Sequence, residues 1–280
     1  MGVRRLLACS FVVSACAEDP VPIPPECNGS IELCTRRYDE VAYATTHNSM
    51  SNAEDAWQSP NQNRTIAHQL DDGVRGLMLD VHEWGDGILL CHGFCPLGSL
   101  PLRDGLATIG RFLHSHRGEV VTIIFESYTT AANIATAFEA ADADRYVYAH
   151  TPGTPWPTLR DLIDNDQRLI VFTDREGGAF DWYMDVWQQA FETPFAAATT
   201  ADLTCDLGRG NGGNPLFIFN HFLSDPLALP DQAPTMNADP FLLDRARSCE
   251  QTRGHLPTFV TVDFYDVGDV FETVRSLNGL

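Results

Sequence analysis

Apolar and polar positions along the chain follow two periods, one typical of strands and one typical of helices. Short runs rich in Val, Ile, Phe and Thr, bounded by turn residues, are typical of buried strands. We expect strands over Val41–Thr46, Gly76–Val81, Ile88–Cys91, Val120–Glu126, Arg168–Thr173, Leu216–Asn220 and Thr258–Phe264.

Helical spacing separates these strands. Leu102, Leu106, Ile109 and Leu113 are spaced to cover one face of a helix. The alternation of strands and helices continues after about residue 38 without a linker-like break. It favours one α/β domain whose parallel sheet closes into a single barrel, with an open doubly wound sheet as the alternative. We expect further helices over Ala131–Ala141, Asp181–Phe191, Pro240–Cys249 and Gly268–Leu277.

The charge composition excludes several classes of function. The 280 residues contain 18 Lys+Arg and 38 Asp+Glu, a net charge of -20, and every one of those cations is arginine. Schiff-base chemistry and phosphate binding by a P-loop lysine are excluded, because both need a lysine amine. So acidic a surface repels a phosphate backbone, and we therefore expect no nucleic-acid partner.

The first residues follow the order of an export signal. Arg4 and Arg5 precede an apolar run over Leu6–Val13, and small residues follow that run. The run is too short to span a bilayer permanently. We therefore expect residues 1–15 to be a signal peptide.

The end of this signal favours lipid anchoring. The sequence Val13-Ser14-Ala15-Cys16 resembles the bacterial lipobox, whose cysteine becomes the lipidated first residue of the mature protein. We expect Cys16 to accept the lipid, and acyl chains to hold the exported protein in the bacterial cell envelope. A plain secretory signal cleaved near Ala17, which gives a secreted protein, is the alternative. Residues 16–37 would form a tether with a disulfide segment, and 38–280 the barrel.

Six cysteines remain after Cys9 and Cys16, an even number that suits an oxidising compartment. Zinc binding is an alternative reading, but no CxxC pair recurs at zinc-finger spacing. Proximity along the chain favours three disulfides, although other pairings remain open: Cys27–Cys34, Cys91–Cys95 and Cys205–Cys249.

Polar residues stand at strand ends where an apolar run would otherwise continue. A single histidine at a strand end is more often structural than catalytic, so the set carries the argument. The carboxyl ends of barrel strands are where reacting groups collect, so we expect the set at one mouth. It comprises His47 and Asn48 after the first strand, Asp80 in the second, His92 after the third, Glu126 in the fourth and Asp263 in the last.

These residue types suit hydrolysis of a phosphodiester by general acid–base catalysis. One neutral imidazole takes a proton from an attacking hydroxyl, while a protonated one gives a proton to the leaving alkoxide. The charge that develops on the phosphoryl oxygens needs a cation. Without lysine, that cation is an arginine or a metal, and Asn48, Asp80 and Glu126 offer the oxygen ligands that calcium prefers.

Five segments together resemble the X domain of phosphatidylinositol-specific phospholipases C. The resemblance covers nearly everything after residue 38 and implies a distorted (β/α)8 barrel of the TIM type. It also implies cleavage of phosphoinositides to diacylglycerol and inositol phosphate, by attack of the inositol 2-hydroxyl through a cyclic intermediate. The segments are THNS at Thr46–Ser49, GVRGLMLDV at Gly73–Val81, CHG around His92, VVTIIFES at Val120–Ser127 and the closing FVTVDFYDVGDVFETVRSLNG.

The resemblance assigns catalytic roles by matching positions. His47 matches the general base and His92 the general acid. Asp263 is our choice for the carboxylate that orients His47, with Asp266 as the alternative. A disulfide between Cys91 and Cys95 would close a tight loop that holds the proposed acid in position.

Three positions resemble the calcium-dependent members. Asn48, Asp80 and Glu126 stand where those members have an amide and acids, whereas metal-independent bacterial members have Asp, Arg and Lys there. The resemblance therefore implies a Ca²⁺ cofactor on these three residues. Animal enzymes carry another acid two residues before Asp80, where this chain has Met78, so we expect weaker calcium binding.

Two arginines are candidates for substrate binding. Arg75 could contact the phosphate, although an ion pair at the barrel mouth is the alternative, and Arg175 could hold inositol hydroxyls. We interpret the glycine-rich run Gly208–Asn214 as a flexible surface loop rather than a phosphate loop, because no helix-opening pattern follows it.

The sequence thus predicts a monomeric, calcium-assisted phosphoric diester hydrolase that acts on phosphatidylinositol-type lipids at a membrane surface. A catalytically silent barrel that binds sugar or lipid head groups as a surface lipoprotein is one alternative, favoured by Met78 and by the absence of lysine. A glycerophosphodiester or sphingomyelin phosphodiesterase on a related barrel is another.

Overall fold

The computed structural model describes residues 22–224 and 227–280. The expected signal peptide, the lipid acceptor Cys16 and the first part of the tether lie outside these residues. Within them, the strands are β1 (Tyr43–Thr46), β2 (Gly76–Trp84), β3 (Gly87–Leu90), β4 (Leu100–Pro101), β5 (Val121–Tyr128), β6 (Val147–Tyr148), β7 (Leu169–Thr173), β8 (Tyr183–Asp185), β9 (Ala190–Glu192), β10 (Leu216–Asn220) and β11 (Phe259–Val262).

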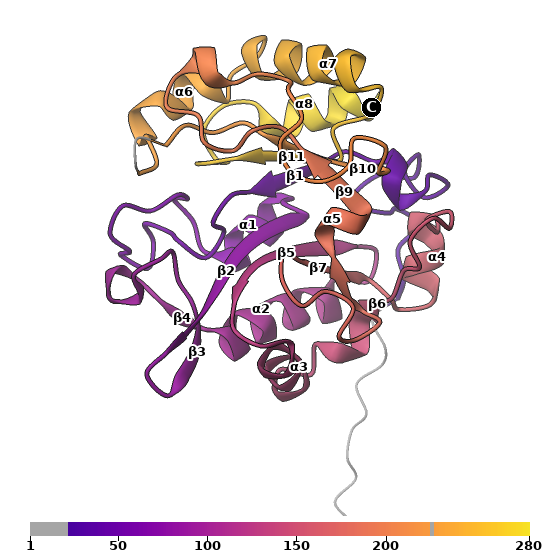
Figure 1. The fold of residues 1–280 in the computed structure, drawn as a ribbon. Helices are drawn as coiled ribbons and strands as arrows, with labels where there is room; N and C mark the ends of the chain where they lie inside the picture. Colours follow the sequence, from indigo (N-terminus) through magenta and orange to yellow (C-terminus); the bar gives the residue numbers. More distant parts are fainter. Residues whose placement is uncertain (1–21, 225–226) are drawn as a thin grey trace, which may run out of the picture.

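Helices cover the outside of the sheet, with α2 (Leu102–Ser115) and α3 (Ala131–Ala140) below it in Figure 1 and α7 (Phe241–Arg253) and α8 (Val270–Leu277) above it. The other α-helices are α1 (Ile66–Asp72), α4 (Leu159–Asp164), α5 (Val186–Gln189) and α6 (Ala233–Met236). Short 3-10 helices span Tyr38–Glu40, Cys95–Leu97, Asp144–Tyr146, Thr200–Asp202 and Pro230–Gln232. None of the helices in the described ranges has both the length and the apolarity that a bilayer span needs.

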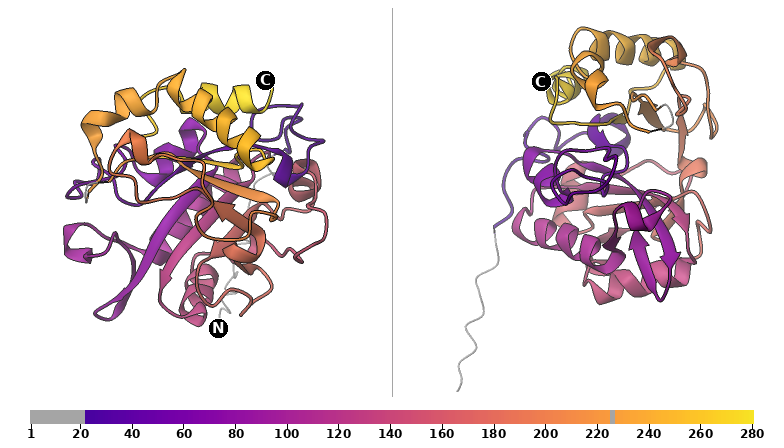
Figure 2. Two further views of the ribbon diagram at one scale, coloured as in Figure 1. Left: turned by 45° about the horizontal axis from the view of Figure 1, so that its top comes forward. Right: turned by 90° about the vertical axis from the view of Figure 1, so that its left-hand side faces the viewer.

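The strands form one curled, mostly parallel sheet in the order β6-β7-β5-β2-β1-β11-β10-β9 (Figures 1 and 2). The first strand pairs in parallel with the last, from Tyr43 opposite Phe259 to Thr46 opposite Val262. This pairing of the chain's two ends is how a barrel closes. The expected α/β barrel is therefore confirmed. It is distorted, because no ladder in the described residues joins β9 to β8 or β6.

Successive side chains of each strand point to opposite faces of the sheet and pack in two separate apolar layers. On β5, Ile123 and Phe125 pack in the layer between sheet and helices, whereas Ile124 packs in the layer inside the barrel. Phe217 and Ile218 of β10 divide in the same way. Every second side chain therefore points toward the barrel axis, and a polar residue at such a position near a strand's end opens into the mouth.

The expected helix over Asp181–Phe191 is wrong for most of its length. Its first part is β8, which pairs with β7, and its last part lies in β9, which pairs with β10. Only α5 between them is helical, and the Asp185 side chain caps it by accepting a hydrogen bond from the Trp187 backbone N–H. Strand pairing at both ends thus overrides a helical period that was local.

The third expected strand is real but is not a barrel strand. β2 continues beyond the mouth, and β3 returns antiparallel beside it, with Leu90 opposite Val81. The Cys91 backbone N–H then donates to the Asp80 carbonyl at 3.2 Å. The hairpin therefore brings the chain back to the level of Asp80, so that the residues after β3 still lie at the mouth.

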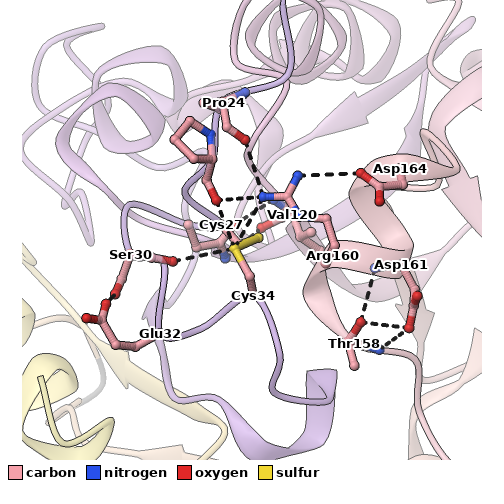
Figure 3. Close-up of a disulfide and its surroundings, with 12 residues drawn as sticks. Pro24, Cys27, Ser30, Glu32, Cys34, Val120, Thr158, Arg160, Asp161 and Asp164 are labelled. Carbon is pink, nitrogen blue, oxygen red and sulfur yellow. Dashed lines mark hydrogen bonds and ion pairs between the residues drawn. A yellow bond between two sulfur atoms is a disulfide. The ribbon is translucent and has the colours of Figure 1, made fainter.

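The three expected disulfides, Cys27–Cys34, Cys91–Cys95 and Cys205–Cys249, are all present. Figure 3 shows the first of them beside Arg160 of α4, which donates to the Pro25 carbonyl at 2.7 Å. The Asn28 backbone N–H donates to the Gly118 carbonyl, just before β5. The segment before the barrel is therefore fastened at the amino-terminal end of the sheet, away from the mouth.

Candidate active site

His47 lies at the mouth directly after β1, where its backbone N–H donates to the Val262 carbonyl at 3.0 Å. Its Nδ1 is 3.0 Å from Oδ1 of Asp263, and its Nε2 is 3.1 Å from Nδ2 of Asn48. Because a carboxylate only accepts, Nδ1 carries the ring proton and Nε2 is left as an acceptor. Asp263, and not Asp266, is thus the carboxylate beside this ring.

Two residues that the sequence analysis did not name complete the surroundings of His47. Asn61 is buried and donates from Nδ2 to Oδ1 of Asp263 at 3.2 Å. Phe222 stacks on the imidazole, with ring centroids 3.9 Å apart and planes 8° from parallel. A signal for Phe222 existed, because polar residues follow β10 as they follow the other strands; Asn61 lies in a loop and left none.

His92 faces His47 from the loop after β3. The centroids of the two imidazoles are 6.5 Å apart and their planes are inclined by 70°. The disulfide between Cys91 and Cys95 closes the loop that carries His92. His47 lines the pocket and His92 lies beside it, outside its lining, and the two rings are close enough to serve two oxygens of the same phosphodiester.

Asp80 and Glu126 are neighbours on adjacent parallel strands, in register with each other. Both line the pocket, together with Asn48. Burial, and then the charge of Glu126, raise the pKa of Asp80 to about 8. A cation bound between the two carboxylates would relieve that repulsion, so the donor set fits a hard divalent ion.

The protein side of such a metal site is sparse. In the part of the chain that the structure describes, no three His, Cys, Asp or Glu side chains are grouped so that they could hold a metal ion. The expected set contains two carboxylates, and its third ligand is the amide of Asn48, whose backbone adopts the left-handed region at φ 46°. Met78, which packs against the inner apolar layer, supplies no further ligand. Water and substrate oxygens would have to complete the shell.

The two histidines are shifted in opposite directions. Burial acts to lower the pKa of His47, but the charge and hydrogen bond of Asp263, with Asp80 and Glu126, raise it overall. Burial and the nearby His47 lower the pKa of His92. With these carboxylates charged, His47 holds a proton more strongly than His92 does, although the resemblance assigns His47 the role of base. A cation beside Asp80 and Glu126 would offset two of the charges that raise its pKa.

The opposite wall of the pocket contains Arg209, in the segment that we expected to be a flexible surface loop. The segment is indeed an exposed loop, and backbone hydrogen bonds hold its first part. The backbone N–H of Glu192 donates to the Arg209 carbonyl, and that of Gly208 donates to the Glu192 carbonyl, so the loop pairs along the edge of β9. A Cβ at Gly210 would lie 2.3 Å from the Ala190 carbonyl oxygen, so only glycine permits this approach.

Arg75 does not reach the site. It precedes β2, about 16 Å along the strand from Asp80, and therefore lies at the amino-terminal end of the sheet. Its Nε donates to Glu119 at 2.7 Å, and its Nη1 donates to the carbonyls of Leu70 and Val74. The expected phosphate contact is therefore wrong. The ion-pair alternative is correct, except that the pair lies at the end away from the mouth.

Arg175 follows β7 and lies at the rim. Its guanidinium carbon is 4.3 Å from the centroid of the Tyr128 ring, and its Nε is 3.8 Å from a carboxylate oxygen of Asp174. Asp174 lines the pocket, whereas Arg175 does not. Tyr128 also donates its hydroxyl to Glu126. Arg175 is thus coupled to the metal-ligand candidates through two side chains and could meet only a ligand that extends to the rim.

Comparison with known proteins gives consistent matches over this region. The family model of the PI-PLC X domain, described as PI-PLC X 1, matches residues 33–278. The PI-PLC X domain-containing protein 1 of Arthroderma benhamiae is 32% identical over 91% of this chain and 90% of its own length. An Arabidopsis thaliana PI-PLC X domain-containing protein is 29% identical over 86% of this chain and 62% of its own.

A second fungal relative and a solved structure extend the comparison. An uncharacterized secreted protein of Arthroderma benhamiae is 26% identical over 91% of this chain and 64% of its own. A mutant of the phosphatidylinositol-specific phospholipase C from Staphylococcus aureus superposes with a TM-score of 0.60. That likeness covers 88% of this chain and 95% of the other at 12% identity, and it shows a shared fold.

Proposed function

Because the chain belongs to the PI-PLC X domain family, we propose that it is a phosphoric diester hydrolase that cleaves phosphatidylinositol-type lipids to diacylglycerol and an inositol phosphate. The observation that carries the proposal is the pair His47 and His92, whose ring centroids are 6.5 Å apart at one mouth. Attack and departure at phosphorus occur on opposite sides of one atom, so two imidazoles flanking it can serve both oxygens.

His47 is the proposed base. Its Nδ1–H donates a hydrogen bond to Asp263, and at Nε2 the inositol 2-hydroxyl takes the place of the Asn48 amide and gives up its proton as its oxygen bonds to phosphorus. His92 gives a proton to the diacylglycerol oxygen as the phosphorus–oxygen bond breaks. A cyclic inositol phosphate results. Water then opens it with the proton transfers reversed, which restores both histidines.

Packing and hydrogen bonds hold the proposed base in position. Phe222 covers one face of the His47 ring, and Asn61 donates to the same Asp263 oxygen that accepts the hydrogen bond from Nδ1–H. These contacts restrict rotation of the imidazole and keep Asp263 beside Nδ1. A reacting oxygen therefore meets a fixed Nε2, which lowers the entropic cost of reaction.

We propose that Asn48, Asp80 and Glu126 hold Ca²⁺ when it is bound. The cation would stabilise negative charge on the phosphoryl oxygens. Asp80 and Glu126, in register on neighbouring strands, place two carboxylates on the same side of the pocket. Asn48, adjacent to the base, ties that position to His47 through the contact between its Nδ2 and the imidazole Nε2.

Exposed apolar side chains next to His92 favour a lipid substrate over a soluble diester. Trp84 is 41% exposed, Phe94 53% and Leu97 40%. The rings of Trp84 and Phe94 meet edge-on, with centroids 5.3 Å apart. Aromatic and leucine side chains of this kind insert into the interfacial region of a bilayer. With a net charge of -20, attraction to anionic head groups does not hold the protein there, so apolar contact must.

Export of the protein accords with its three disulfides, which are typical of oxidising compartments. One relative is named a secreted protein. We propose that the chain acts outside the cytoplasm, and that lipidation at Cys16 holds it in the envelope.

The test is turnover of phosphatidylinositol by the purified protein with product analysis. We expect diacylglycerol and a cyclic inositol phosphate, loss of both on His47→Ala or His92→Ala, and a fall in rate when calcium is chelated. Full activity in chelator would remove the metal from the proposal and leave the rest. Binding without turnover of any phosphodiester would instead identify a silent head-group-binding barrel. Products from other glycerophosphodiesters or sphingomyelin alone would assign a different substrate.

A further inference from the structure

Arg209 lies on the pocket wall across the mouth from the proposed metal ligands. It pairs with Glu192 of β9, and β9 stands four places from β2, which carries Asp80, along the curled sheet. In a barrel-like sheet, four places lead to the opposite side. A head group whose phosphate lies between the histidines would therefore extend its ring toward Arg209.

The guanidinium of Arg209 is held on several sides. Its Nε and Nη2 lie 2.5 and 3.2 Å from the two carboxylate oxygens of Glu192. Its central carbon lies 4.6 Å from the Trp187 ring centroid and 4.4 Å from that of Phe195. Glu192 is only 2% exposed and also accepts from Asn220 at 3.0 Å. A planar, delocalised cation can pair in two places and stack at once, which an ammonium cannot.

The fixed guanidinium still has donors to offer. A guanidinium carries five N–H groups, and Glu192 takes two of them. The Arg209 side chain is 45% exposed and lines the pocket. Its remaining N–H groups can therefore donate to adjacent oxygens of a bound ligand without any rearrangement.

The charge of the pocket wall around Arg209 determines which ligand oxygens it can bind. Among the residues that line the pocket, Arg209 is the one Arg or Lys, and its charge is paired with Glu192. Burial raises the pKa of Asp174, a further pocket residue, and the charge of Arg209 acts against that rise. Hydroxyl groups gain hydrogen bonds here, whereas a second phosphate would meet carboxylates with no unpaired cation to offset them.

We propose that Arg209 is a specificity-determining residue that binds the ring hydroxyls of a polyol head group, and that its pairing with Glu192 disfavours head groups carrying a further phosphate. This inference rests on the proposed function for its substrate. Binding of the free polyol tests it separately from turnover.

The first experiment measures binding of myo-inositol to the full-length protein by calorimetry. We expect Arg209→Met to raise the Kd at least tenfold. We expect Arg209→Lys to raise it as well, because an ammonium cannot donate two parallel N–H groups in one plane. The matched control is Arg145→Met, since Arg145 also pairs with an acid, Asp142, and lies over an aromatic ring, Tyr146, but stands outside this pocket.

Thermal unfolding of each variant shows whether its fold is intact. If the fold is intact and Arg209→Met binds myo-inositol as the wild type does, the inference is overturned. Absence of saturable binding by the wild type at millimolar concentrations overturns it too. Loss of catalysis with binding retained would contradict the proposed function alone.

The second experiment tests the charge pairing with Glu192→Gln, which keeps the shape and removes the negative charge. We expect the ratio of kcat/KM for phosphatidylinositol 4-phosphate to that for phosphatidylinositol to rise at least tenfold. If neither lipid is turned over, the Kd ratio of inositol 4-phosphate to myo-inositol replaces it, and that ratio should fall at least tenfold because a lower Kd means tighter binding. An unchanged ratio contradicts discrimination by this pair.

Discussion

His47 and Asp263 stand far apart in the sequence and meet through a 3.0 Å contact between Nδ1 and Oδ1. The contact follows from the parallel pairing of β1 with β11, since each residue directly follows one of these strands. A donor–acceptor pair placed by two strands is rigid. It determines that the acceptor nitrogen of the imidazole is Nε2.

Replacement of this carboxylate tests its orienting role. We expect Asp263→Asn to lower kcat for phosphatidylinositol on the order of a hundredfold or more, because the amide no longer enforces the Nδ1–H tautomer. Asp266→Asn is the matched control, since that carboxylate accepts from Asn63 at the surface. Steady-state kinetics with thermal unfolding would check it. Equal kcat values in the two folded variants would contradict the assignment.

The disulfide that closes the His92 loop gives a second prediction. Only four positions separate Cys91 from Cys95, so the bond adds little loop entropy to global stability but restricts the residues between them. We expect Cys91→Ser with Cys95→Ser to lower kcat about tenfold, because the proposed acid is no longer held at the mouth.

The matched control is removal of the disulfide at the other end of the barrel, Cys27→Ser with Cys34→Ser. We expect that pair of substitutions to reduce thermal stability and leave kcat unchanged. An equal loss of kcat in both double variants would show that the effect is general and not specific to the His92 loop.

Strong periodicity explains which parts of the fold were predictable. On β5, uncharged buried side chains fill both faces until Glu126 interrupts the inward-facing row. The same interruption marks Asp80, so one signal located two pocket residues and the strands that carry them. The barrel followed, because parallel strands with helical connections have few other arrangements.

The residues that escaped prediction are placed by contacts distant in the sequence. Asn61 reaches Asp263 because its neighbour Gln62 donates to the carbonyls of His47 and Val262, which fixes the loop across the β1–β11 edge. Arg209 faces the pocket because its loop pairs with β9, a strand whose own sequence had a helical period. No local sequence pattern predicts either contact.

The exposed aromatic pair beside the mouth predicts how the protein binds membranes. We expect Trp84→Ala and Phe94→Ala each to weaken binding to phosphatidylcholine vesicles several-fold in a sedimentation assay, since each removes a large apolar surface from the contact. Ile31→Ala is the control, because Ile31 is 60% exposed but belongs to the segment fastened at the opposite end of the sheet.

The charge of the protein adds a condition to the same assay. With a net charge of -20, we expect anionic lipid in the vesicles to weaken binding, and added salt to restore part of it. Stronger binding to anionic vesicles, or an effect of Ile31→Ala as large as that of Trp84→Ala, would contradict apolar docking at the mouth.

His221, buried behind the site, predicts how stability depends on pH. Its Nε2–H donates to the Met236 carbonyl at 2.8 Å, and its Nδ1 accepts from Nη1 of Arg245 at 3.0 Å. Burial and the charge of Arg245 lower the pKa of His221 to about 3. Between that value and the ordinary histidine pKa of about 6.5, the unfolded chain binds a proton that the folded protein does not.

On acidification from neutral pH, His221 therefore contributes a loss of about 2 kcal/mol by pH 5, while the raised pKa of Asp80 acts in the opposite direction. We expect His221→Gln, which keeps one donor and one acceptor, to remove this share. The measurement is the free energy of unfolding in urea at pH 7 and pH 5. The exposed His114 gives a control, His114→Gln, whose loss should match the wild type. If His221→Gln loses as much stability on acidification as the wild type, this histidine is not held neutral by Arg245 and its buried surroundings.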